Sequence, residues 1–331
     1  MHIVVSFFPV LVFLVLLNFF DSYKLVKPRS VLFAIVIGFV AAFLSFLVNT
    51  VLMNMFTSET RAYSLFGAPV VEELLKASYL AYLIYSKRVG FMVDAAIYGF
   101  AIGSGFACVE NVYYLHELGT TNILLWVIRG FGTAVMHGGT TAIFGIVSKN
   151  ISDRYSQKRF LAFLPGVATT IIVHSLFNLF FLPPIIETLL TIVLLPLLLF
   201  LVFKRSEQST RVWLGSGLDA DMEILHSMMI TDLSETNIGK YLHTLRERFP
   251  AEVIVDMLCL LRIHTELAIR SKGILMMREA GFKSQPDADT VEKFAELRFL
   301  EESIGKTGKM AIAPFLHTAS RDLWQIYMLE N

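Results

Sequence analysis

The stretch that decides the fold is GAPVVEELLKASYLAYLIY, residues 67–85. It is long and apolar enough to cross a bilayer, which takes about 20 mostly apolar residues. It nevertheless carries Glu72, Glu73 and Lys76. On insertion scales, each charged side chain near the bilayer centre costs about 2.5–3.5 kcal/mol. Because such charges are costly, we expect these three side chains to face other polar groups and to have a function.

The whole chain has the composition of a membrane protein. Its 331 residues are 55% hydrophobic and 17% charged, with a mean hydropathy of +0.62. The net charge is zero, which gives no indication of nucleic-acid binding. There are only two cysteines, Cys108 and Cys259, too few for a disulfide framework.

Seven apolar stretches are long enough to span a bilayer. They are residues 3–20, 31–54, 66–86, 91–115, 122–148, 160–182 and 185–203. No basic residue precedes the first stretch and no small-residue cleavage site follows it, so we interpret it as a retained helix and not a signal peptide. We therefore expect an all-α, polytopic membrane protein with about seven transmembrane helices.

Lysine and arginine are concentrated in every second loop, starting with the loop between the first two predicted spans. The positive-inside rule places these basic loops in the cytoplasm. The N-terminus is then expected outside, and the region after the last span inside. We expect the protein to be integral to the cell (inner, cytoplasmic) membrane.

Four of the predicted spans carry polar side chains that are unusual in hydrocarbon. These are Glu72, Glu73 and Lys76; Asp94, Glu110 and Asn111; Arg129 and His137; and His174 and Asn178. At 1.5 Å per residue, most of the ionisable groups lie about 7–12 Å below the outer boundary. His137 lies about 22 Å below it, unless the outer end of its long span protrudes from the bilayer and brings His137 up. Asp94 falls near the other surface, where we expect it to cap its helix. The rest predict one polar site in the outer half of the bilayer.

Helical spacing divides the roles of these residues. Lys76 lies four residues after Glu72 and three residues after Glu73, so it can reach either carboxylate. Glu72 and Glu73 point about 100° apart on a helix, so we expect one to face the site and the other to pair with Lys76. His174 and Asn178 share a face. The span that carries Glu110 also contains small residues that permit close helix approach, namely Gly99, Gly103 and Gly105.

Four segments resemble the PrsW family of intramembrane proteases, a branch of the superfamily that contains the CAAX prenyl proteases. They are EELLK (72–76), FACVEN (106–111), HGGTTAIFG from His137 and HSLFN (174–178). They occur in the family's order, within about residues 60–182. The resemblance implies hydrolysis of a membrane-anchored protein within or at the edge of the membrane. The best-known branch cleaves an anti-sigma factor on its outer side.

The residues and the resemblance together define a candidate site. Its candidate catalytic residues are Glu72, Glu73, Glu110, His137, His174 and Asn178, with Lys76, Phe106, Asn111 and Arg129 in support. Peptide hydrolysis needs an activated water, a stabilised oxyanion and an acid for the leaving amine. Our sequence interpretation gives His174 and Asn178 the last two tasks.

Two ways of activating the water remain open. In the first, a glutamate is the base, and analogy with the CAAX branch favours Glu72. In the second, a divalent ion such as Zn²⁺ is held by Glu73, Glu110, His137 and His174, because two histidines with a carboxylate form a known catalytic zinc site. The CAAX branch has a histidine where this chain has Glu110, which leaves metal dependence open.

Other functional classes fit parts of the pattern. The charges can form an ion cluster that only locks helices together. Buried Glu, Lys and His also form the proton relays of ion-coupled carriers, although no inverted repeat is visible and the polar residues lie away from the midplane. A non-catalytic membrane scaffold is the third alternative.

The region after residue 203 has an ordinary soluble composition. We expect a membrane domain over residues 1–203, a linker over 204–217 and a soluble helical domain over 218–331. Leucine and isoleucine recur at helical spacing in 221–230, 237–249, 251–282, 290–308 and 316–330. Pro250 fits the start of the long helix and Gly281 its end. This helix is apolar on more than one face, so we expect the domain to serve in homodimerisation or regulation.

Overall fold

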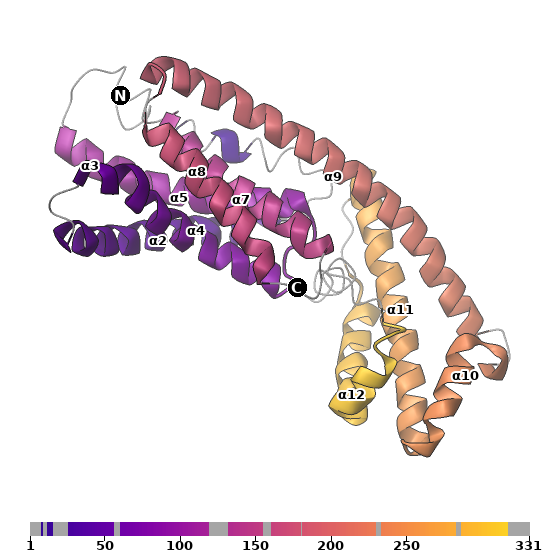
Figure 1. The fold of residues 1–331 in the computed structure, drawn as a ribbon. Coiled ribbons are helices and arrows are strands. Elements are labelled where there is room, and N and C mark those ends of the chain that lie inside the picture. The colour runs from indigo at the N-terminus through magenta and orange to yellow at the C-terminus, as the bar shows by residue number, and fades with distance from the viewer. Residues whose placement is uncertain are drawn as a thin grey trace. The chain divides into compact units, whose positions relative to one another are not determined.

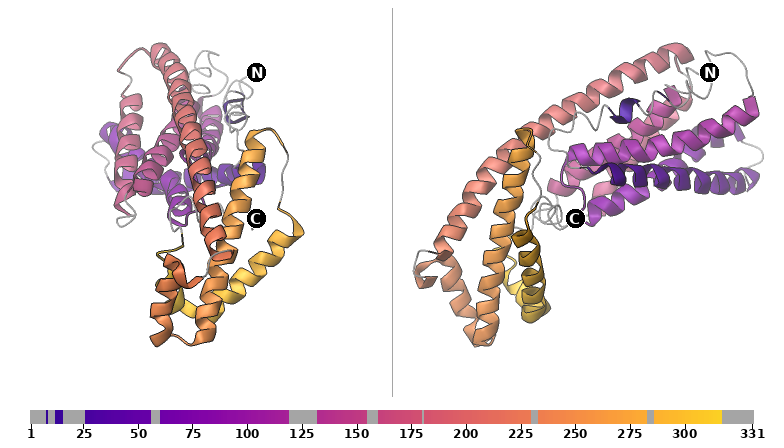
Figure 2. Two further views of the ribbon diagram at one scale, coloured as in Figure 1. Left: turned by 90° about the vertical axis from the view of Figure 1, so that its right-hand side faces the viewer. Right: turned by 180° about the vertical axis from the view of Figure 1, so that it is seen from behind.

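The computed structural model describes residues 8, 12–15, 26–55, 60–118, 132–154, 160–179, 181–229, 233–282 and 286–316. Within these residues the chain is helical and contains no strand, which confirms the expected all-α class. The chain divides into two compact units, Met1–Glu207 and Gln208–Asn331. Figures 1 and 2 show the helices of each unit.

The first unit is built from helices that match the predicted spans with shifted ends. They are α2 (Pro28–Met55), α3 (Thr60–Ala62), the π-helical turn η1 (Tyr63–Gly67), α4 (Ala68–Tyr85), α5 (Met92–Leu118), α7 (Ala134–Arg154), the 3₁₀ turn η4 (Leu161–Phe163), α8 (Leu164–Asn178) and the first part of α9 (Pro184–Met229).

Four segments of the described chain are long and apolar enough to cross a membrane: α2, α5, η4 with α8, and α9. The expected count was seven. Of the other three predicted spans, the one in α4 carries Glu72, Glu73 and Lys76, and the one in α7 is less apolar. The stretch 3–20 lies largely outside the described residues.

Helix α5 is the centre of the first unit. It packs between α2 and α7, and most of its apolar segment is buried, whereas α2, α8 and α9 expose most of theirs. Figures 1 and 2 show α2, α4, α5, α7 and α8 lying side by side. The carboxylate of Asp94 accepts hydrogen bonds of 3.1 Å from the backbone N–H groups of Gly90 and Phe91, as expected for a residue that caps its helix.

Glycines let the backbones of these helices touch. A methyl group added at Gly103 of α5 would lie 2.1 Å from the carbonyl oxygen of His137 on α7. One added at Gly105 would lie 2.1 Å from the carbonyl oxygen of Ile35 on α2. Close approach through small residues is how membrane helices pack tightly. The sequence-based expectation for the glycines of this span is confirmed.

Residues 204–217, which we expected to form a linker, are helical. They continue α9 without a break from Pro184 to Met229. Thr210, Leu214 and Asp221 are buried at intervals of four and seven residues, which places them on one face of the helix. The Ser- and Gly-rich composition indicated a break. Packing of this face stabilises the helix, because tertiary contacts outweigh weak local propensity.

The second unit contains the remainder of α9, η5 (Leu233–Glu235), α10 (Asn237–Thr244), η6 (Leu245–Glu247), α11 (Ala251–Glu279) and α12 (Ala288–Ile312). Its core is apolar, with buried residues that include Met257 and Leu267 of α11 and Leu297 of α12. Pro250 is the residue immediately before α11, and Gly281, just past its end, has a φ of 86°. The last expected helical stretch, 316–330, lies almost entirely outside the described residues.

We predict that Gly103→Ala destabilises the first unit, because its new methyl group would overlap the backbone of α7. Overpacking of this kind costs about 1–3 kcal/mol, measurable as a lower midpoint of thermal unfolding in detergent. Gly273→Ala is the matched control, since no atom lies within 4 Å of that position on α11. Gly273→Ala should be neutral or stabilising, by up to about 1 kcal/mol. Equal unfolding midpoints for Gly103→Ala and wild type would contradict the close packing.

Candidate active site

Side chains from four helices of the first unit meet at one place. They are Glu72, Glu73 and Lys76 of α4, Glu110 of α5, His137 of α7 and His174 of α8. The sequence analysis assigned all six to one site. The spacing in α4 puts the glutamates on adjacent faces, so each has a different set of partners.

Glu73 is the buried anchor of this cluster. Its side chain is 1% exposed, and its Oε1 atom lies 2.5 Å from Lys76 Nζ and 2.8 Å from His174 Nδ1. The hydroxyl of Thr140 on α7 also donates to this oxygen, at 3.3 Å. Lys76 is fully buried as well. One carboxylate oxygen thus links α4, α7 and α8.

His137 links α4 to α5. Its Nδ1 lies 3.0 Å from Lys76 Nζ and its Nε2 lies 2.6 Å from Glu110 Oε2. A lysine ammonium can only donate, so Nδ1 accepts and the N–H at Nε2 faces Glu110. The ring centre lies 4.9 Å from that of Phe106 and 5.0 Å from the perpendicular ring of His174. Both nitrogens of this imidazole therefore have polar partners, and the ring also packs against Phe106 and His174.

Glu72 is held by residues that the sequence analysis missed. Its Oε1 accepts a hydrogen bond from Asn49 Nδ2 at 3.4 Å, and its Oε2 lies 3.8 Å from His174 Nε2. The hydroxyl of Tyr63 donates to Asn49 Oδ1 at 2.7 Å, and Asn49 Nδ2 also reaches Ser45 Oγ at 3.2 Å. The available signal was an amide within the long apolar α2 segment.

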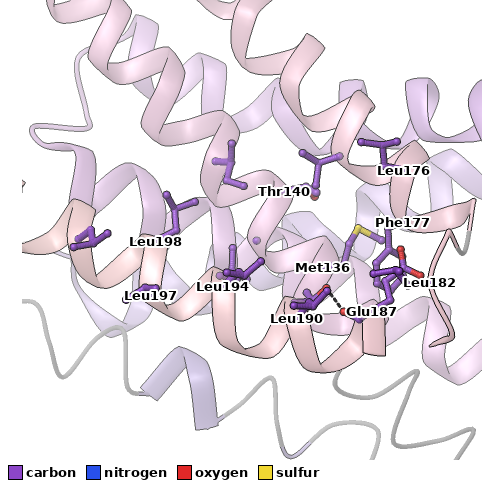
Figure 3. Close-up of a pocket in the computed structure, with 16 residues that line it drawn as sticks. Met136, Thr140, Leu176, Phe177, Leu182, Glu187, Leu190, Leu194, Leu197 and Leu198 are labelled. Carbon is purple, nitrogen blue, oxygen red and sulfur yellow. Dashed lines mark hydrogen bonds between the residues drawn. The ribbon is translucent and has the colours of Figure 1, made fainter. Parts of the chain in front are cut away.

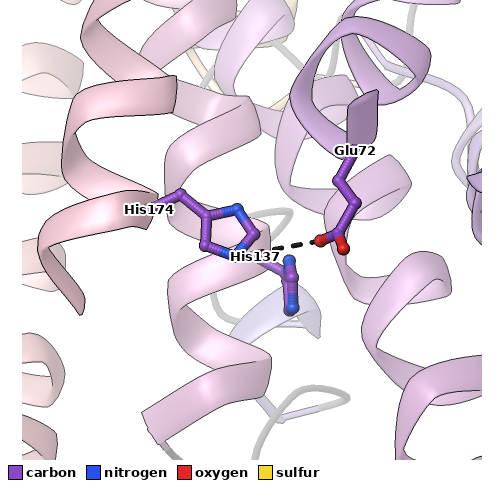
Figure 4. Close-up of side chains that lie close together, drawn as sticks. All are labelled: Glu72, His137 and His174. Atoms are coloured by element: carbon purple, nitrogen blue, oxygen red, sulfur yellow. Dashed lines mark ion pairs between the residues drawn. The ribbon is translucent and has the colours of Figure 1, made fainter. Parts of the chain in front are cut away.

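Glu72, His137 and His174 point toward one another from α4, α7 and α8 (Figure 4). One possible ligand atom of each lies within 4.8 Å of the others. Two histidines and a carboxylate match the donor set of catalytic zinc sites, in which bonds near 2.0–2.2 Å place ligand atoms about 3.4 Å apart. The donor chemistry therefore fits a divalent ion, with a contraction of about 1 Å.

The surroundings of the two histidines also fit. Metal-binding histidines usually give their second ring N–H to a carboxylate or carbonyl. Here Glu73 contacts His174 Nδ1, and Glu110 contacts His137 Nε2. His174 Nε2 is then directed at Glu72, whereas His137 Nδ1 must give up Lys76 before it can bind an ion.

Some expected residues fall elsewhere. The expected depth of about 22 Å for His137 was counted from residue 122. Residues 119–131 lie outside the described part of the chain, and the structure places His137 in contact with Glu110. Asn178 is the last residue of α8, one turn beyond His174. Asn111 is buried beside Glu110 on α5, and Arg129 lies outside the described residues. We expected an ion to be held by Glu73, Glu110, His137 and His174. The possible ion-binding group among the described residues consists of Glu72, His137 and His174, without Glu73 and Glu110.

We predict that Lys76→Met strongly destabilises the first unit, because it leaves the buried carboxylate of Glu73 without its counter-charge. Removing one partner of a buried pair costs about 3–5 kcal/mol, measurable as a lower thermal unfolding midpoint in detergent. The double variant Glu73→Gln/Lys76→Met should recover most of the loss, since no buried charge is left unpaired.

Lys309→Met is the control for this prediction. It breaks the half-exposed pair of Lys309 and Glu301, and exposed pairs contribute less than about 1 kcal/mol. A Lys76→Met protein as stable as the Lys309→Met protein would show that the Glu73–Lys76 pair does not hold the site together.

One of three comparisons with known proteins gave a match. The family model described as "PrsW family intramembrane metalloprotease" matches residues 27–203, which is more than half of the chain and contains every residue of the described cluster. No curated protein and no solved structure matches the chain. On the extent of the family match, the chain belongs to the PrsW family of intramembrane metalloproteases and is an integral membrane hydrolase.

Proposed function

We propose that this protease hydrolyses a peptide bond of a membrane-anchored protein near the outer side of the membrane, using Glu72, His137 and His174. The observation that carries the proposal is the convergence of these three side chains, with donor atoms within 4.8 Å of one another. They come from three different helices, so the arrangement depends on the fold and not on local sequence.

The two glutamates have separate tasks in this proposal. The side chain of Glu72 is 18% exposed and that of Glu73 is 1% exposed. Glu73 already accepts bonds from Lys76 and His174, so it positions the histidine and keeps its neighbours paired. Glu72 is the one of the pair with access to a water molecule, as a reacting carboxylate requires.

Glu72, His137 and His174 would hold a divalent ion, in accordance with the family description. Such an ion lowers the pKa of a bound water to about 7 and polarises the scissile carbonyl. Glu110, whose side chain is 26% exposed, is then the remaining carboxylate able to take a proton from water. We assign the oxyanion contact to Asn178, one turn beyond His174.

The topology of the proposal rests on the distribution of charge. Basic residues fill alternate loops, which favours an outer N-terminus and a cytoplasmic location for the C-terminal region. The substrate is then a membrane-anchored protein cut on its outer side, with anti-sigma-factor-like proteins as the first class to test. The helical C-terminal domain, residues 218–331, is proposed to act in homodimerisation or regulation, with 204–217 joining it to the membrane domain.

Reconstitution of the full-length protein with a panel of single-span membrane proteins tests this function. We predict that Glu72→Gln and His174→Ala each lower the cleavage rate by at least about 10²-fold. A chelator should abolish cleavage and added Zn²⁺ should restore it. Glu235→Gln, which alters a 73% exposed carboxylate, is the control. Cleavage that survives both site substitutions would contradict the proposed site. Cleavage that is insensitive to chelation would contradict the role of the metal and leave Glu72 as the base.

We also predict that Asn49 positions Glu72. Asn49→Ala removes the hydrogen bond to the carboxylate and should lower kcat about 10–100-fold, the usual effect of removing a residue that orients a site ligand. KM should change little, because Asn49 contacts Glu72 and not the substrate. Thr50→Ala is the matched control, since the exposed Thr50 hydroxyl bonds only to the backbone of its own helix. A kcat unchanged in Asn49→Ala would contradict the role.

A further inference from the structure

An apolar groove with a cavity volume of about 590 Å³ lies between α7, α8 and α9 in the first unit (Figure 3). Its floor includes Met136 and Thr140 of α7, and Leu176 of α8 and Leu194 and Leu198 of α9 line its sides. The lining is almost entirely aliphatic. A pocket of this size is in the range that binds drug-sized molecules or one face of a peptide.

The groove lies next to the candidate active site. Thr140 lines the groove, and its hydroxyl oxygen lies 3.3 Å from Glu73 Oε1 and 3.1 Å from the backbone carbonyl of His137, so it can donate its one hydrogen to either. Val173, the neighbour of His174, also lines it. The same two helices therefore present histidines to the site and apolar side chains to the groove.

The groove is long enough to hold most of the length of a membrane-spanning helix. Its α9 wall extends from Glu187 to Leu201, a distance of about 21 Å at 1.5 Å per residue. This is about two-thirds of the 30 Å hydrocarbon core of a bilayer. An apolar groove of this kind receives one face of an amphipathic or apolar helix.

Glu187 is the one ionisable residue among those that line the groove. Its Oε2 atom is buried and, within the described part of the chain, accepts no hydrogen bond. The nearby Thr191 hydroxyl donates to the backbone carbonyl of Glu187 and not to its carboxylate. A buried polar atom without a partner is costly, so this carboxylate is suited to a cationic group supplied by a ligand.

We propose that the groove binds one face of the substrate's apolar transmembrane helix, and that Glu187 pairs with a lysine or arginine at the end of that helix. This inference rests on the proposed proteolytic function, and it assigns that function a substrate-binding surface and a specificity-determining residue. The occupant is a helix because the groove is apolar along its length, carries a carboxyl group at one end and adjoins the catalytic cluster through Thr140.

Cysteine crosslinking tests the groove without requiring cleavage. The full-length Glu72→Gln protein, with Cys108→Ser and Cys259→Ser, would carry one new cysteine at Leu194 or Leu198. Leu189 and Val193, exposed on α9 and not part of the groove lining, are the control positions. The probe is a synthetic Leu/Ala transmembrane peptide with one central cysteine and a lysine at one end, in phosphatidylcholine vesicles.

The groove positions should crosslink to the peptide at least tenfold more than the controls, and unlabelled peptide should compete. Equal crosslinking at all four positions, or none at any, would overturn the binding surface. Crosslinking that unlabelled peptide fails to reduce but added phosphatidylethanolamine reduces would make the groove a lipid site, which also overturns the inference. The crosslinking uses the Glu72→Gln protein and does not depend on cleavage. A failure of the groove proposal is therefore distinguishable from a failure of the wild-type protein to cleave in the reconstitution assay.

A charge exchange tests Glu187. The lysine peptide should bind at least tenfold more tightly than the same peptide with glutamine, and Glu187→Gln should abolish that difference. Glu187→Lys should instead prefer a peptide that carries glutamate at the same position. Equal binding of the lysine and glutamine peptides to the Glu187 protein would overturn the assigned specificity, even if groove crosslinking persists.

Discussion

The arrangement of the membrane unit depends on the buried ion pair between Glu73 and Lys76. Their atoms are 2.5 Å apart and both side chains are almost completely excluded from water. Such a pair is tolerated only when its remaining hydrogen-bonding capacity is used, because loss of either partner leaves an uncompensated buried charge. Here His174 hydrogen-bonds to the Glu73 carboxylate, and His137 accepts a hydrogen bond from the Lys76 ammonium group. The pair therefore fixes α7 and α8 in position against α4.

Glycines in α5 make this polar cluster compact. Gly103 lies against the backbone of His137, so α5 and α7 approach closely enough for Glu110 to reach the imidazole. The site and the groove are formed by neighbouring faces of α7 and α8, with Thr140 in contact with both. The side chains of the site are paired within the protein, whereas the groove, which α9 completes with Glu187 at one end, is apolar along its length. This arrangement suits an enzyme whose substrate arrives within the bilayer.

The residues of the cluster could be predicted because each violates the composition of an apolar span. Glu73, Glu110 and His174 are conspicuous in hydrocarbon, and helical spacing indicated that the two neighbouring glutamates would differ in role. Asn49 was missed because an amide side chain in an apolar helix does not by itself indicate which neighbouring helix it faces. The depth of His137 stays a prediction, because most of the predicted span that precedes it, residues 119–131, lies outside the described part of the chain. The helical state of 204–217 was missed because packing overrode composition.

By itself the sequence determined the all-α membrane class, the family and the types of side chain in the site, since these follow from hydropathy and from residue order. Only the tertiary structure decided that Glu73 is the buried anchor, whereas Glu72 faces His137 and His174. It also decided that Glu187 borders a groove next to the site. The physical reason is that these assignments depend on which faces of separate helices meet, and interhelical packing, not spacing along one helix, sets that.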